Sequence, residues 1–216
     1  YTRHSNQKVL LDLFTDLPEG LVEWLSAEDL AKLNDMRAAT RLTMQANVER
    51  SRDEVSTAFD KLQEALTMSP NNPVARNDMV SLLLRSANQL SEDRNFEQAW
   101  YQYQAVLQYS PDEFWALYQM VILAMQSNQP DLAGQFLEQG MAAYPDAPMF
   151  RALRGKYRGT LGDPAAACAD YEYAVGLLPD HPMLWREYAF FLRQAGRAAE
   201  ADEAEAKAEK LQGAKL

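Results

Sequence analysis

Several features on which enzymes depend are missing from this sequence of 216 residues. Cys168 is the single cysteine, so no internal disulfide can form, and cysteine usage does not distinguish a reducing from an oxidising compartment. The two histidines, His4 and His181, lie far apart, and the spacing typical of metal-ligating Cys and His residues is absent. Neither a phosphate-binding glycine loop nor a nucleophile elbow is present. These absences predict a protein that is not an enzyme and that holds no cofactor or metal.

Two further absences concern membranes and nucleic acids. No apolar run approaches the roughly 20 residues that a membrane-spanning helix needs, so the sequence predicts no membrane insertion. The formal net charge of −10 argues against a basic surface that binds nucleic acid nonspecifically. The chain starts at Tyr1 rather than at methionine, which is typical of an excised domain or of a processed product that has lost a targeting or membrane segment. The compartment therefore stays open between cytoplasm and periplasm.

What the sequence does contain is a pattern of small and bulky residues that recurs at a constant interval. A small residue is followed by a bulky one four positions later, by a small or branched one three positions after that, and by a proline five positions beyond. The copies are Ala99, Tyr103, Val106 and Pro111; Ala133, Leu137, Gly140 and Pro145; and Ala167, Tyr171, Ala174 and Pro179. A related copy starts at Ala58. Alanine, leucine and glutamate are plentiful whereas valine and isoleucine are sparse, so the pattern favours helices.

The spacing is irregular at one place. The step from Ala58 to Ala99 is seven residues longer than the step from Ala99 to Ala133. Seven extra residues are very nearly two turns of an α-helix, so they can lengthen a helix without rotating its apolar face. We therefore expect an unusually long helix from about Val74 to Leu90, and a longer loop at residues 91–95 is the alternative.

A helix–turn–helix unit of about 34 residues with this signature resembles the tetratricopeptide repeat. The best preserved copy carries Trp185, Tyr188, Ala189, Leu192 and Gly196. The resemblance implies an all-α fold, a right-handed superhelix of antiparallel helix pairs whose concave face is lined by the first helix of each pair. It also implies a scaffold without enzymatic activity that binds a peptide or protein partner in the concave groove, as part of a larger assembly.

The register divides the chain into an N-terminal helical extension (1–38), a repeat array (39–211) and a C-terminal tail (212–216). The units of the array are about 39–72, 73–113, 114–147, 148–181 and 182–211, and the first helix of the first unit is expected at roughly 40–51. The second helix of the last unit is rich in alanine and charge, which predicts a solvent-facing cap. The extension contains apolar clusters, and a helix is expected to start at Ser26, which is followed by the acidic residues Glu28 and Asp29. It is expected either to cap the first repeat or to form a docking or dimerisation surface.

The register also predicts which side chains line the groove, because most of them lie eleven or fifteen residues before a marker alanine. The predicted partner-binding residues are Asn47, Arg85, Asn88, Tyr118, Ile122, Met125, Lys156, Arg186 and Phe190. Amides can bond the backbone of an extended peptide, aromatic rings can anchor apolar side chains, and Lys156 or Arg186 can bind a carboxylate. A ligand of mixed apolar and charged character is therefore expected. The alternative is that these side chains are solvated or pack between neighbours.

Two other clusters have two interpretations each. Arg151, Arg154 and Arg158 form one helical stripe that either receives an acidic partner or pairs internally with neighbours such as Asp163 or Glu172. The aromatic residues between Trp100 and Tyr118 are expected mostly in the core between repeats, with Trp115 able to reach the groove. Aromatic side chains on the convex face would indicate a second interface instead.

Two alternatives to groove binding stay open. One is an oligomerisation module, in which the N-terminal extension or the convex face makes a homo-oligomer. The other is a non-catalytic domain of a larger enzyme or of a membrane-anchored assembly protein.

Overall fold

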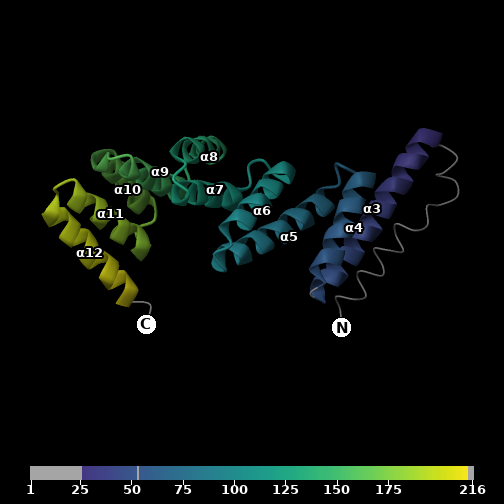
Figure 1. Cartoon of the computed structure of the whole chain (residues 1–216), viewed down its shortest axis with the longest axis horizontal. Helices are drawn as coiled ribbons and strands as arrows, with labels where there is room; N and C mark the ends of the chain where they lie inside the picture. Colours follow the sequence, from purple (N-terminus) through teal and green to yellow (C-terminus); the bar gives the residue numbers. More distant parts are fainter. Residues whose placement is uncertain (1–25, 53, 214–216) are drawn as a thin grey trace. The chain divides into compact units, whose positions relative to one another are not determined.

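The computed structural model describes residues 26–52 and 54–213, which form ten α-helices and contain no strand (Figure 1). These helices are α3 (Ala27–Ser51), α4 (Val55–Met68), α5 (Pro73–Glu92), α6 (Phe96–Tyr109), α7 (Phe114–Gln126), α8 (Pro130–Ala143), α9 (Pro148–Thr160), α10 (Pro164–Leu177), α11 (Pro182–Gln194) and α12 (Ala198–Gly213). The chain divides between Gln89 and Leu90 into two compact units.

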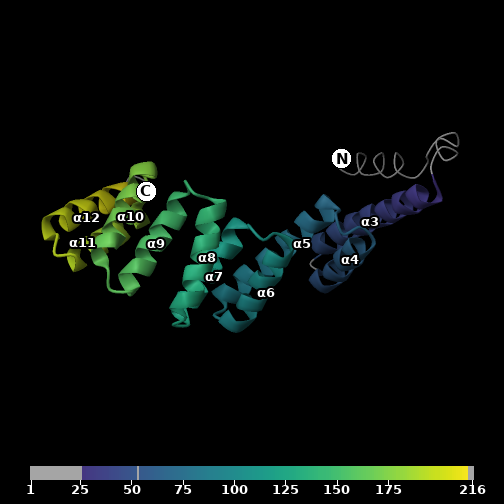
Figure 2. The same cartoon turned by 90° about the horizontal axis from the view of Figure 1, so that it is seen from above.

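In the first unit, α3 and α4 pack side by side (Figures 1 and 2). The capping role predicted for Ser26 is confirmed, because its Oγ accepts a hydrogen bond of 3.1 Å from the backbone N–H of Asp29. Helix α3 then runs without a break for 25 residues, so the expected start of the repeat array at residue 39 falls inside a helix. No glycine or proline stands between Ser26 and Arg52, so nothing in this stretch interrupts the helix. The apolar clusters expected before Ser26 lie outside the described residues.

The predicted long helix is confirmed in α5. Helix α5 has 20 residues, whereas α7, α9 and α11 have 13 residues each. The seven extra residues therefore lie within the helix and not in a loop. The apolar face is kept, because Leu83 and Ala87 are both buried.

Within the second unit, each turn from a first to a second helix has the same geometry. Arg94, Asn128, Gly162 and Gly196 all have positive φ and follow one another at the interval of the repeat. At the last of these turns, the N–H of Gly196 donates to the carbonyl of Arg193, and the N–H of Arg197 donates to the carbonyl of Leu192. The same pair of hydrogen bonds occurs at the other three turns and is the Schellman arrangement that ends a helix. The repeat is thus present in the backbone as well as in the sequence.

Close helix packing explains the small residues of the pattern. The marker alanines Ala99, Ala133, Ala167 and Ala201 are fully buried. A Cβ atom added to Gly140 would lie 2.2 Å from Phe150 Cε1, and one added to Gly155 would lie 2.9 Å from a ring carbon of Tyr171. Helix α12 buries only Ala201, Ala204 and Ala208, so it covers α11 with a thin stripe, as expected of a closing helix.

Candidate functional site

A groove of about 210 Å³ lies on the first helices α7, α9 and α11 of the second unit. The side chains that give this groove its chemistry are Tyr118, Ile122, Met149, Lys156, Tyr171, His181, Met183 and Glu187. Helices α9 and α11 are held by the buried cluster beneath them, which includes Tyr171, Leu184 and Phe191. The groove is therefore built on packed helices and not on loops.

One wall of the groove is aromatic. Tyr118 is half-buried, and its ring lies edge-on to Phe150 at a centroid distance of 6.2 Å and to Trp115 at 5.9 Å. Burial raises the pKa of the Tyr118 hydroxyl, and the negative charge of Glu187 raises it further. Trp115 is half-exposed beside Tyr118, but it is not among the residues that line the groove.

A pair of opposite charges spans the groove between α9 and α11. Lys156 Nζ lies 3.6 Å from Glu187 Oε1, and Tyr171 donates a hydrogen bond of 2.9 Å to Glu187 Oε2. Burial and the nearby carboxylate raise the pKa of Tyr171 far above its ordinary value, so this hydroxyl keeps its proton and orients Glu187. Both members of the Lys156–Glu187 pair are substantially solvated, so their mutual attraction is weak and a ligand can replace it.

His181 completes the groove at the start of α11. Its backbone is the N-cap residue of that helix, and its Nδ1 atom is buried with no hydrogen-bond partner among the described residues. The imidazole therefore contributes an unsatisfied buried nitrogen at the edge of the groove.

Of the predicted site residues in the second unit, the structure brings three together in the groove and places the other three outside it. Tyr118, Ile122 and Lys156 line the groove. Arg186 is turned towards α12, where it donates a hydrogen bond of 2.7 Å to Gln212. Met125 packs against the apolar cluster of α7 and α8, and Phe190 is half-exposed with its ring edge-on to Phe191.

The remaining predicted residues belong to the first unit. The side-chain amide of Asn47 donates a hydrogen bond of 2.8 Å to Asp78 Oδ2, so Asn47 is engaged within that unit. Arg85 and Asn88 lie exposed on α5. These three positions stay predictions as binding residues.

The sequence reasoning did not place Met149, His181, Met183 and Glu187 in the groove, and it assigned Tyr171 only to the repeat pattern. Met149 and Met183 share a register position eighteen residues before the marker alanines Ala167 and Ala201, so the repeat itself contains the signal for them. Glu187 and His181 had no such signal, because their roles depend on Tyr171 and on burial.

The arginine stripe on α9 is held internally for the most part. Asp170, which is buried on α10, accepts hydrogen bonds from the guanidinium groups of both Arg154 and Arg158. Arg151 lies over the ring of Tyr173 at 4.7 Å. The sequence analysis gave internal pairing of these arginines as one alternative, with acidic neighbours such as Asp163 or Glu172. The structure shows that the carboxylate that pairs with Arg154 and Arg158 is Asp170.

Across residues 26–52 and 54–213, no three His, Cys, Asp or Glu side chains gather in a way that could hold a metal ion. No helix in these ranges is both long and apolar enough to cross a bilayer. Cys168 is buried on α10, and burial raises the pKa of its thiol, which disfavours the reactive thiolate.

Comparisons with known proteins agree with the repeat architecture. Residues 90–157 match the family model described as tetratricopeptide repeat. A comparison with curated protein sequences gives no match.

Among solved structures, the chain is similar to MamA, residue 41 to the end, from Desulfovibrio magneticus RS-1, with 19% identity and a TM-score of 0.59 over 82% of this chain and 96% of that one. It is also similar to YrrB, described as a TPR protein with an unusual peptide-binding site, with 16% identity and a TM-score of 0.58 over 87% of this chain and 93% of that one. At such identities the likeness concerns the fold, and it confirms the predicted fold class, an all-α superhelical repeat of helix pairs.

Proposed function

Because this chain belongs to the tetratricopeptide repeat family, we propose that it is a non-catalytic scaffold that holds an extended peptide segment of a protein partner in the groove, within a larger assembly. The observation that carries the proposal is the groove itself, in which an apolar wall stands beside one oriented pair of opposite charges. The peptide-binding site reported for the similar YrrB adds support.

The groove favours a ligand with both an apolar and a charged group. Tyr118, Ile122 and Met149 offer an apolar surface for an aliphatic or aromatic side chain. A ligand carboxylate can replace Glu187 as the partner of Lys156, while Glu187 can accept hydrogen bonds from a ligand amide or cation. Because the lining residues stand on packed helices, little conformational entropy of the protein is lost on binding.

The test begins with short peptides selected on the full chain from a random displayed library. The selected peptides are then titrated by calorimetry against the unchanged protein and against Tyr118→Ala and Lys156→Glu. We expect each substitution to weaken binding by about tenfold, which corresponds to roughly 1.4 kcal/mol.

Leu161→Ser provides the matched control, because Leu161 is exposed and lies outside the groove. The control is expected to bind the peptides as the unchanged protein does. The proposal is wrong if both groove substitutions leave the affinity unchanged, or if Leu161→Ser weakens binding as much as they do.

A further inference from the structure

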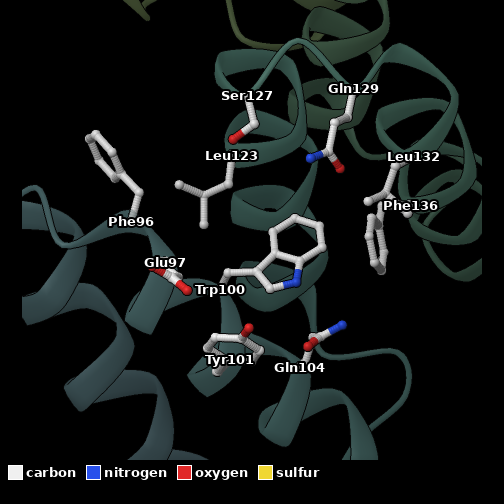
Figure 3. Close-up of a pocket in the computed structure, with 10 residues that line it drawn as sticks. All are labelled: Phe96, Glu97, Trp100, Tyr101, Gln104, Leu123, Ser127, Gln129, Leu132 and Phe136. Carbon is white, nitrogen blue, oxygen red and sulfur yellow. The ribbon is translucent and has the colours of Figure 1, made fainter.

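A second pocket lies on helices α6, α7 and α8, and it shares no residue with the groove. It has a volume of about 490 Å³. We call it the aromatic pocket, and its main lining residues are Phe96, Glu97, Trp100, Tyr101, Leu132 and Phe136. Figure 3 shows the indole of Trp100 in the middle of these side chains, with Glu97 and Tyr101 from the same helix beside it.

The aromatic pocket combines a fixed floor with an exposed rim. Trp100 is half-buried and packs against the apolar cluster of α7 and α8, with its ring edge-on to Phe136 at 5.7 Å. Tyr101 is 61% exposed and Phe96 is 42% exposed, which is far more than large aromatic residues of a folded core. The floor is therefore structural, whereas the rim is available to a partner.

The charged residues on the helices that carry the aromatic pocket, α6 to α8, are all acidic, and the nearest basic residue along the chain is Arg94, two residues before Phe96. Between residues 95 and 150 the sequence contains six acidic residues and no lysine, arginine or histidine. Glu97 stands within the pocket, one helical turn before Trp100 and Tyr101. Glu97 and Asp131 lie in the first turns of α6 and α8, where they offset the positive ends of these helices. The field at the pocket therefore attracts cations.

We propose that the aromatic pocket binds a basic segment of a protein partner, with a lysine or arginine side chain lying on the Trp100 ring and its charge facing Glu97. The tryptophan face attracts a cation through its quadrupole, and the nearby carboxylate adds an opposite charge. The side-chain amides of Gln104 and Gln129 also line the pocket and can bond the backbone of the segment. A second copy of this chain is a poor occupant, because each copy has a net charge of −10 and like charges repel.

The experiment uses pools of short amidated peptides that carry lysine, arginine, norleucine or glutamate at one fixed position. Binding to the full chain is followed by the NMR signal of the Trp100 indole N–H, which Trp100→Phe assigns. We expect the lysine and arginine pools to bind at least about tenfold more tightly than the norleucine pool, and the glutamate pool to bind most weakly. The preference for lysine over norleucine is expected to fall as salt is added, because the charges are screened.

Two variants separate local from overall charge. Glu97→Lys changes the charge within the aromatic pocket, whereas Glu138→Lys makes the same change at an exposed position of α8 outside it. The proposal predicts that Glu97→Lys removes the preference for lysine and that Glu138→Lys keeps most of it. The proposal is overturned if the norleucine pool binds as tightly as the lysine pool, or if Glu97→Lys and Glu138→Lys change the preference for lysine equally. It is also overturned if sedimentation shows self-association of the chain that Tyr101→Ala abolishes.

Discussion

The groove and the aromatic pocket are built from the same repeat but differ in chemistry. The groove places Lys156 and Glu187 opposite one another beside the apolar side chains of Ile122 and Met149. The aromatic pocket is lined by large rings and carries a single carboxylate, Glu97. The helix pairs thus determine where a side chain stands, and the residue types at those positions determine which ligand is attracted. Changes in α9 and α10 should therefore affect the groove and leave the aromatic pocket intact.

The largest effect is expected from Asp170→Ala. This change leaves the guanidinium groups of Arg154 and Arg158 without the buried carboxylate that now joins α9 to α10. We expect the free energy of unfolding to fall by about 2–4 kcal/mol, since both arginines keep some contact with water. Urea unfolding followed by circular dichroism measures it.

Asp202→Ala is the control for this prediction, because Asp202 pairs with Arg193 at the solvated surface. It is expected to leave the urea midpoint unchanged. An equal loss of stability in the two variants would show that burial of Asp170 does not matter. Under native conditions, Asp170→Ala is also expected to weaken groove binding more than binding at the aromatic pocket.

A smaller effect on stability is expected from Gly159→Ala. A Cβ atom at residue 159 would lie 2.1 Å from Phe191 Cε1, so the packed Phe191 ring of α11 would have to shift. We expect a loss of about 1–3 kcal/mol in the free energy of unfolding, together with weaker binding in the groove. Gly176→Ala is the control, because a Cβ atom there meets nothing within 4 Å and α10 gains helix propensity. A neutral Gly159→Ala would contradict the close approach of the Phe191 ring to α9.

The two sites are compared most sharply by exchanging the charges of the groove. The double variant Lys156→Glu with Glu187→Lys keeps an attractive pair but reverses its direction. We expect selected peptides to lose about tenfold in affinity, and a new selection to yield peptides with the opposite order of charge. Binding of the lysine pool at the aromatic pocket is expected to stay the same. A loss at both sites would mean that they are not independent.

The smallest effect is expected at the turns. Arg94 has a φ of 59° and Gly162 has a φ of 86°, and only glycine adopts such values without steric cost. Arg94→Gly is therefore expected to raise the free energy of unfolding by about 0.5 kcal/mol, and Gly162→Ala to lower it by about 1 kcal/mol. Asn128→Gly is expected to change it less than Arg94→Gly, because asparagine tolerates this region. Thermal unfolding of the three variants checks the order.

Much of the fold could be predicted because the repeat is a local property of the sequence. The spacing between Ala58 and Ala99 predicted a long α5, with a longer loop as the alternative, and the structure shows the long helix. The helix expected at about 40–51 is present, but it begins at Ala27, because no residue between Ser26 and residue 40 interrupts α3. The boundaries of a helix depend on residues that end helices, such as glycine and proline. Its buried face depends on the spacing of the apolar residues.

The candidate sites could be predicted only in part. The register located Tyr118, Ile122 and Lys156, since these positions follow from the helix face. It did not identify Glu187 or Asp170, because their partners lie on neighbouring helices whose relative rotation is set by packing. The acidic stretch around the aromatic pocket is visible in the sequence. The sequence alone does not predict a cation site there, because only the structure shows that Trp100 and Glu97 line the same pocket.

The most direct test of the central claim uses the methionines as reporters. With ¹³C-labelled methionine methyl groups, each signal assigned by a Met→Leu change, a peptide selected on the chain is titrated into the protein. The proposed function predicts that the signals of Met149 and Met183, which line the groove, shift with the peptide concentration. The signal of Met141, which packs against the cluster of α7, α8 and α9 and lines neither site, is expected to stay in place. Shifts at Met141 with none at Met149 and Met183 would contradict binding in the groove.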